Sequence, residues 1–173
     1  KKLETLNKKG KKRTNNFKFN ILRRVEIKGL STVSEEVVRN ELSVFKGDKL
    51  DPFTINRNIK RIEGLGYFNS VESDLVAFEG GKKWVISVKE NPVVDQIIVT
   101  GNKSIDSADL YSVIETEKGK IFNYAGIRKD IEEIEALYKE KGFLFTKVKK
   151  VDLPTYKTKT LLFNIQESQY GEI

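Results

Sequence analysis

The 173-residue sequence has no cysteine and no histidine. Their absence excludes disulfide bonds, thiol catalysis, cysteine or histidine metal sites and every catalytic triad that needs an imidazole. No apolar run approaches the roughly 18 residues of a membrane-spanning helix. The first residues are polar and lack the apolar core of a signal peptide. Methionine is also absent and Lys1 comes first, so we expect a mature or excised piece of a longer protein.

The positive charge of the chain is concentrated at its N-terminus. The net charge is +7, and residues 1–20 hold eight Lys or Arg against one acid, so the remaining residues are neutral. We interpret residues 1–19 as a basic, flexible, solvated segment. An alternative is an arm that meets anionic lipid head groups or phosphates through Lys8, Lys9, Lys11, Lys12 and Arg13. Nucleic acid is the least favoured partner, because no basic surface with interleaved aromatics follows.

The first half of the body predicts five elements in the order strand, helix, helix, strand, strand. Asp51-Pro52 is a clear helix start, because Asp suits the N-cap and Pro suits the first helical position. Gly66 ends that helix. The expected elements are a strand over 17–27, helices over 35–45 and 52–65, and a hairpin of strands over 71–78 and 84–88.

The second half repeats this order. Gly119 follows Gly101 by 18 residues, as Gly47 follows Gly29, and duplicated spacing of this kind indicates a tandem repeat. The expected elements are a strand over 94–100, helices over 107–115 and 124–141, and strands over 148–153 and 160–165. We therefore divide the chain into a basic segment (1–19), two domains (20–91 and 92–168) and a linker towards a next domain (169–173).

Four short motifs carry a resemblance to a known family. They are Ile27-Lys28-Gly29-Leu30, Gly47-Asp48-Lys49-Leu50-Asp51, Gly66-Tyr67-Phe68-Asn69-Ser70-Val71 and Val88-Lys89-Glu90-Asn91-Pro92. Together with the β-α-α-β-β order they resemble the POTRA (polypeptide-transport-associated) domain. The junction, with Gly101-Asn102-Lys103-Ser104-Ile105, is similar to that between neighbouring POTRA domains of the BamA-type barrel-assembly family. The second unit departs from the pattern at Asn123 and at Gly142-Phe143-Leu144-Phe145.

The resemblance implies an α+β fold of two tandem units, each a three-stranded mixed sheet covered on one face by two helices. It also implies a scaffold on the periplasmic side of the outer membrane, ahead of a C-terminal membrane β-barrel of the same polypeptide. Its expected partners are unfolded outer-membrane proteins and accessory assembly subunits. An alternative is a POTRA module of an outer-membrane protein or lipid export transporter.

An exposed sheet edge is the candidate binding site. If the third strand of each unit is central, the second strand leaves unpaired backbone groups that can add an incoming strand. In the first unit this strand contains no proline and comprises Val71, Glu72, Ser73, Asp74, Leu75, Val76, Ala77 and Phe78. In the second unit, Lys149-Lys150 and Pro154-Thr155 are expected to charge and interrupt it. The alternative is that both edges are ordinary solvated edges.

The linker predicts a stiff joint. Glu90, Asn91 and Pro92 form the interdomain hinge, and Pro92 restricts both itself and Asn91. A short, restricted linker favours a few angles between the units over free tumbling.

Other classes of function find little support. Asp130, Glu132, Glu133 and Glu135 fall in one predicted helix, and we interpret them as a solvated face opposite an isoleucine stripe. The sequence offers no candidate pair of a catalytic nucleophile and a general base. We therefore expect no enzyme activity, no bound metal and no cofactor. An RNA-recognition sheet would need a β-α-β-β-α-β order, so the remaining alternative is nucleic-acid or anionic-lipid binding by the basic arm alone.

Overall fold

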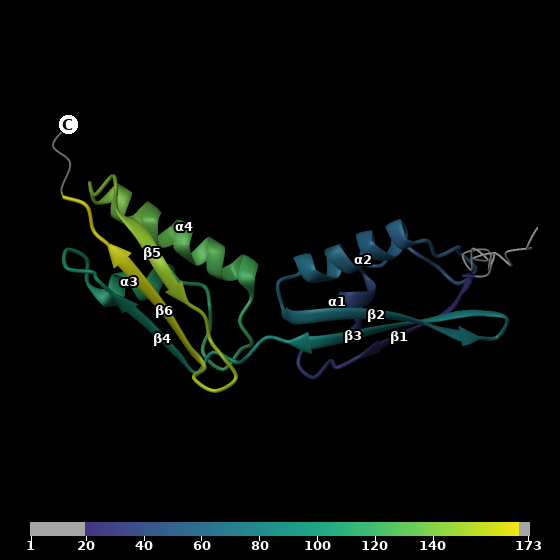
Figure 1. The fold of residues 1–173 in the computed structure, drawn as a ribbon. Helices are drawn as coiled ribbons and strands as arrows, with labels where there is room; N and C mark the ends of the chain where they lie inside the picture. The colour runs from purple at the N-terminus through teal and green to yellow at the C-terminus, as the bar shows by residue number, and fades with distance from the viewer. Residues whose placement is uncertain (1–19, 170–173) are drawn as a thin grey trace, which may run out of the picture.

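The computed structural model describes residues 20–169 and contains two three-stranded sheets, each with two helices (Figure 1). The basic cluster Lys8–Arg13 and most of the expected C-terminal linker lie outside these residues. The first unit comprises β1 (Leu22–Lys28), α1 (Glu35–Arg39), α2 (Pro52–Gly64), β2 (Phe68–Phe78) and β3 (Gly81–Glu90). The second comprises β4 (Gln96–Thr100), α3 (Ser107–Val113), α4 (Tyr124–Glu140), β5 (Lys147–Asp152) and β6 (Thr160–Gln166).

Both sheets have the same mixed topology. The strand orders are β1-β3-β2 and β4-β6-β5. The first and third strands of each unit pair in parallel, and the second and third pair antiparallel. The predicted α+β fold, with the last strand in the middle and the second strand at an edge, is confirmed.

Each sheet buries one face against its helices. In the first unit the core includes Leu22, Val38, Ile62, Trp84 and Ile86, all almost fully buried. The Nε1 atom of Trp84 donates a hydrogen bond to the Ser73 hydroxyl at 2.6 Å, which satisfies its only polar group. The second unit has a separate hydrophobic core of the same kind. Loss of packing in one core therefore removes no contact from the core of the other unit.

The caps of the two long helices follow the sequence prediction. The side chain of Asp51 accepts a hydrogen bond from the Thr54 N–H at 2.8 Å, and Pro52 occupies the first turn. Asn123 caps α4 through the N–H groups of Ala125 and Gly126. Helix α4 has 17 residues against 13 in α2, a one-turn difference that keeps its apolar stripe in phase. Asp106 occupies the N-cap position of α3 without a side-chain cap bond.

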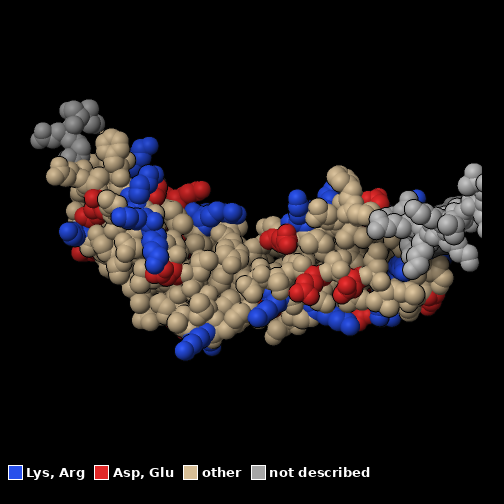
Figure 2. Space-filling model, viewed as in Figure 1, with Lys and Arg blue, Asp and Glu red and all other residues tan. Residues whose placement is uncertain are grey.

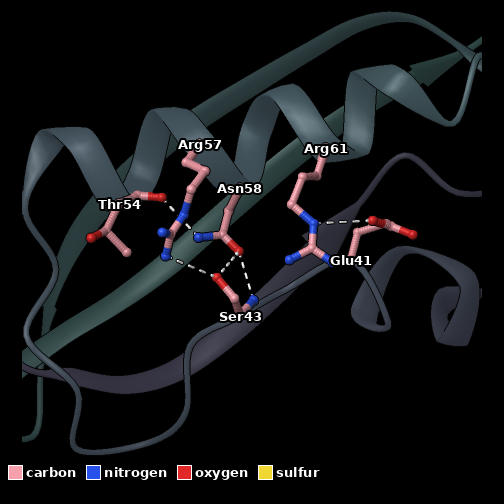
Figure 3. A network of polar contacts seen from close by, with 6 residues as sticks. All are labelled: Glu41, Ser43, Thr54, Arg57, Asn58 and Arg61. Carbon is pink, nitrogen blue, oxygen red and sulfur yellow. Dashed lines mark hydrogen bonds and ion pairs between the residues drawn. The ribbon is translucent and has the colours of Figure 1, made fainter.

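The first helix is shorter than predicted. We expected a helix over 35–45, but α1 ends at Arg39. The following segment is held instead by Asn58 of α2, whose side chain accepts the Ser43 N–H at 2.7 Å and donates to the Thr54 carbonyl at 2.8 Å (Figure 3). This tie turns Phe45 outward, with 75% of it exposed, where a helix would have placed it in the apolar stripe.

Two of the four acidic residues predicted on a solvated face of α4 are not solvated. Glu135 is only 21% exposed and bonds to β5, and Asp130 departs further from the prediction. Asp130 is fully buried, and its carboxylate accepts the N–H of Glu115 at 2.7 Å and both the N–H and hydroxyl of Thr116. Asp130 stands 72 residues after Asn58 and fastens the corresponding segment of the second unit. The interpretation of this residue as solvated is therefore wrong, because a backbone segment that lacks helical partners takes its hydrogen bonds from Asp130.

Candidate functional site

The outer edge of β2 is open along its whole length. Residues 68–78 pair with β3 on one side, and no other described strand pairs with β2. Val71 and Leu75 pack against the core, whereas Glu72, Asp74 and Val76 are exposed on the opposite face. Within residues 20–169 we find no side chain that hydrogen-bonds to a β2 backbone group on this edge. Along the eleven residues of β2, the backbone groups of alternate residues therefore face outward without a partner in the described part of the chain.

The equivalent edge of the second unit is partly covered. Strand β5 has six residues, and the N–H of Val148 donates to the Glu135 carboxylate of α4 at 3.0 Å. The same carboxylate holds the Lys147 ammonium at 2.6 Å. Figure 2 shows basic side chains gathered over β5 and acidic ones over β2. Pro154 lies beyond the end of β5 at Asp152, so it does not interrupt the strand as we expected; the helix side chain obstructs the edge instead.

The helix side of the joint between the units is a hydrogen-bonded contact. Asn91 is buried, and its amide donates to the carbonyls of Gly66, at 2.8 Å, and Phe122, at 3.1 Å. The amide of Asn123 donates to the Leu65 carbonyl at 2.7 Å, and the Tyr124 N–H donates to Gly66 at 3.0 Å. The C-terminus of α2 thus meets the N-terminus of α4, which places opposite ends of two helix dipoles together.

The strand side of the joint is closed by the hairpin loop of the second unit. The Tyr156 hydroxyl donates to the carbonyl of Glu90, and the Lys89 ammonium lies 4.6 Å from the centroid of the Tyr156 ring. Among the predicted hinge residues, Glu90 and Asn91 therefore each contact the second unit. Asn123 was predicted as a cap only, and Tyr156 carried no signal in the sequence, because its partner is a backbone carbonyl 66 residues away.

Glu90 also fastens the loop after β1. Its carboxylate accepts the N–H groups of Ser31, Thr32 and Val33 at 2.8 to 3.0 Å. Partial burial alone would raise the pKa of Glu90, but the hydrogen bonds from Ser31, Val33 and Thr32 outweigh it and the pKa is lowered. Glu167 does the same in the second unit, where it accepts the N–H groups of Lys103 and Ser104 and the Tyr138 hydroxyl.

Acid should weaken the first unit through Glu90. A carboxyl group with a lowered folded-state pKa stabilises the fold above its unfolded pKa, and this stability is lost as the pH falls through the folded pKa. We expect Glu90→Gln to cost about 1–2 kcal/mol at pH 7 and to flatten the loss of stability below about pH 4.5. Urea unfolding followed by Trp84 fluorescence at pH 7 and pH 4 measures both effects.

Glu63, which is solvent-exposed on α2, offers the control for this substitution, because the N–H groups of the loop after β1 donate to Glu90. Glu63→Gln should leave both the stability at pH 7 and its acid dependence unchanged. If Glu90→Gln behaves like Glu63→Gln, the three N–H groups of the loop do not depend on the carboxylate charge.

The chain is built of two consecutive β-α-α-β-β units, each with its second strand at a sheet edge. Hydrogen bonds join the units where the end of α2 meets the start of α4, and this arrangement defines a tandem-repeat module. The sequence pattern of the POTRA family, described as "Surface antigen variable number repeat", matches residues 21–91 and again residues 92–168. The chain belongs to the POTRA family.

Named relatives agree with this family. The chain is 31% identical over 129 residues to the outer membrane protein assembly factor BamA of Nitratidesulfovibrio vulgaris. The aligned region covers 75% of this chain and 16% of that protein. It is 28% identical over 127 residues to a putative outer membrane protein assembly factor of Treponema pallidum, covering 72% and 15%. The chain therefore spans about one sixth of the length of these relatives.

Solved structures share the fold. The N-terminal domain of Omp85 from Thermosynechococcus elongatus superposes with a TM-score of 0.72 at 18% identity, covering 84% of this chain and 61% of that one. POTRA1-2 of the periplasmic domain of Omp85 from Anabaena gives 0.66 at 18% identity, covering 88% and 96%. The tandem arrangement seen here is thus also found in Omp85 proteins.

Proposed function

We propose that this chain is a periplasmic scaffold module of an outer-membrane protein assembly machine. It receives unfolded barrel proteins by strand addition to β2 and docks accessory subunits, without enzymatic activity. Membership of the POTRA family and similarity to BamA proteins support this class of function. In the complete protein the module would stand on the periplasmic side of the outer membrane, joined to a C-terminal β-barrel of the same polypeptide. No helix in residues 20–169 has the length and apolar character to cross a membrane.

The open edge of β2 supports strand addition most directly. Backbone hydrogen bonds do not depend on side-chain identity, so an unobstructed edge suits a receiver of many different barrel strands. The exposed face next to this edge carries Glu72 and Asp74, which favours incoming strands with basic or neutral residues on that face. The edge of β5 is shorter, basic and covered at Val148 by Glu135, so the first unit is the better acceptor.

A photo-crosslinking scan tests which edge receives the substrate. A photoreactive amino acid is placed at exposed positions of β2 (Glu72, Asp74, Val76) and of β5 (Lys147, Lys149), and a urea-unfolded outer-membrane barrel protein is diluted onto each variant. We expect crosslinks to β2 to exceed those to β5 several-fold. Equal labelling of the two strands would contradict the proposal.

Removal of the Glu135 carboxylate should open the second edge. Glu135→Ala releases the Val148 N–H, so crosslinking of the same unfolded barrel protein at Lys149 should rise at least two-fold while β2 labelling stays constant. Glu132→Ala, on the exposed surface of the same helix, is the matched control and should change neither. If Glu135→Ala also has no effect, the carboxylate does not limit strand addition at β5.

A further inference from the structure

The two units carry the same groove at corresponding places, beside the first strand of each sheet. In the first unit it lies between β1 and the segment after α1 and measures about 440 Å³. In the second it lies between β4 and the end of α3 and measures about 690 Å³. Val25 and Ile97, which line the two grooves, are 72 residues apart. The groove is therefore a product of the repeated fold. In each unit it lies at the sheet edge formed by the first strand, opposite the edge formed by β2 or β5.

The start of each edge is already paired with the chain's own backbone: Leu22 bonds to Gly47 and Asp48, and Val94, just before β4, bonds to Gly119 and Lys120. Beyond these pairs, a single side-chain hydrogen bond covers each edge within the described residues. An Nη atom of Arg39 donates to the Val25 carbonyl at 3.3 Å, and the hydroxyl of Tyr111, 72 residues later, donates to the Ile97 carbonyl at 3.4 Å. Both bonds are long and solvent-exposed, and such bonds contribute little. In a β-strand the N–H and C=O of one residue point to the same side, so the Val25 N–H faces the groove as well. An incoming strand can replace the Arg39 contact.

The charges of the two grooves differ. The groove beside β1 is lined by four basic residues and no acidic one: Arg23, Arg24, Arg39 and Lys46. The Arg39 charge is shared with Glu35, 2.6 Å away, but the Nε atom of Arg23 is buried without a hydrogen-bond partner in the described part of the chain. The groove beside β4 has one basic residue, Lys118, and no acidic one. The two grooves thus share their place in the fold, but the groove beside β1 carries more positive charge.

We propose that the groove beside β1 binds an extended segment of a partner protein in which apolar residues alternate with acidic ones, added as a strand to β1. Successive side chains of such a strand point to opposite faces. Its apolar residues would lie towards Leu42 and Val44, and its acidic residues towards the arginines. Phe45, exposed at the rim, adds an aromatic contact. This site is independent of strand addition at β2, because the two edges lie on opposite sides of β3.

A defined peptide tests the site in the complete chain. The probe is an eight-residue peptide of alternating valine and glutamate with blocked ends, titrated into the ¹⁵N-labelled protein and followed by amide chemical shifts. We expect saturable shifts along residues 23–27 and 39–46, weaker binding at higher salt, and no binding of the valine–lysine peptide. Arg23→Gln, Arg24→Gln and Lys46→Gln combined should weaken binding at least ten-fold, while Lys118→Gln, the counterpart of the last, should leave it unchanged.

A second probe separates strand addition from charge attraction without any protein variant. Methylation of alternate backbone nitrogens of the valine–glutamate peptide keeps its charges but removes the donors that pair with β1. Binding should fall at least ten-fold when the methylated nitrogens face β1. Equal binding of the methylated peptide would overturn the proposal, as would shifts confined to residues 1–19, β2 or β5. Loss of strand addition at β2 alone would affect the proposed function and leave this result intact.

Discussion

Replacing Gly29 with alanine is expected to unfold the first unit while the second stays folded. Gly29 has φ of +91°, and a Cβ atom built on it would lie 1.9 Å from the Val88 carbonyl oxygen of the central strand. The positive φ alone costs about 1–2 kcal/mol for a residue with a side chain. The overlap with backbone adds several kcal/mol, because β3 cannot retreat without breaking its pairs on both sides. A unit of this size has a total stability of only about 4–10 kcal/mol.

The lone tryptophan makes this result measurable. Trp84 is the only tryptophan of the chain and is fully buried in the first unit, so its fluorescence reports that unit alone, whereas far-ultraviolet circular dichroism reports both. We expect Gly29→Ala to give the emission of exposed tryptophan with about half of the dichroism retained. A Cβ atom added at Gly101 would lie 2.0 Å from the Ile165 carbonyl oxygen. Gly101→Ala should therefore unfold the second unit, so that about half of the dichroism is lost while the emission of buried Trp84 is kept.

Two other glycines separate strain from overlap. Gly47 has φ of +100° with nothing within 4 Å of an added Cβ, so Gly47→Ala should cost only the conformational term of about 1–2 kcal/mol. Gly64, the last residue of α2, has neither restriction, and Gly64→Ala should stabilise the unit by up to about 0.5–1 kcal/mol, the difference in a helix interior. If Gly29→Ala costs no more than Gly47→Ala, the loop after β1 moves away from β3 more easily than the packing indicates.

The features that the sequence predicts well are those encoded by a few neighbouring residues. Asp51-Pro52 and Asn123 mark helix starts because a cap needs only residues within one turn. Gly66 and Gly142 mark helix ends because both adopt positive φ. The hairpin turn at Gly80 follows from the same local rule. Because the 18-residue interval from Gly29 to Gly47 recurs from Gly101 to Gly119, the repeat could be inferred from such signals, whereas the sheet topology is implied by the family resemblance.

The features that the sequence does not predict depend on contacts between distant residues. Helix α1 stops early because Asn58, 15 residues from Ser43, takes over a backbone N–H. The sequence predicts a poorer edge at β5 from Lys149-Lys150 and Pro154, but the cover of that edge comes from Glu135 on a helix. Neither the short helix nor the covered edge follows from local propensity, since tertiary hydrogen bonds override it.

The joint shows the same limit at the level of the two domains. A short linker containing Pro92 predicts stiffness, but the hydrogen bonds that can supply it come from Asn91, Asn123 and Tyr156. These side chains reach carbonyl groups of the other unit or of the linker. A linker sequence alone specifies which angles are allowed; the contacts on both sides of it select one of them.

Replacing Asn91 with aspartate is expected to break this selection at neutral pH. The amide nitrogen of Asn91 donates to the carbonyls of Gly66 and Phe122, and the side chain is 3% exposed. Aspartate has the same shape, but its ionised carboxylate would present an acceptor to two buried acceptors. Burying an unpaired charge in this way costs about 3–5 kcal/mol. We expect loss of stability at pH 7 together with a broader distribution of angles between the units.

The pH dependence of this variant has a defined sign. Burial and the two facing carbonyls raise the pKa of the introduced carboxyl group, so its destabilising effect is present above that pKa and fades as the acid becomes protonated. Asn91→Asp should therefore lie furthest below the wild-type protein at pH 7 and approach it near pH 4. Asn69→Asp, at an exposed position in β2, is the matched control and should change stability by less than about 0.5 kcal/mol.

Two measurements follow the consequences of Asn91→Asp separately. Urea unfolding by Trp84 fluorescence and circular dichroism gives the stability of each unit, and distances between spin labels on α2 and α4 give the distribution of angles. A broad distance distribution at pH 7 that narrows towards pH 4 is the expected result, because a protonated carboxyl can donate one of the two lost hydrogen bonds. A narrow, wild-type distribution at pH 7 would mean that Pro92 and the contacts of Asn123, Tyr124 and Tyr156 hold the orientation without the Asn91 amide.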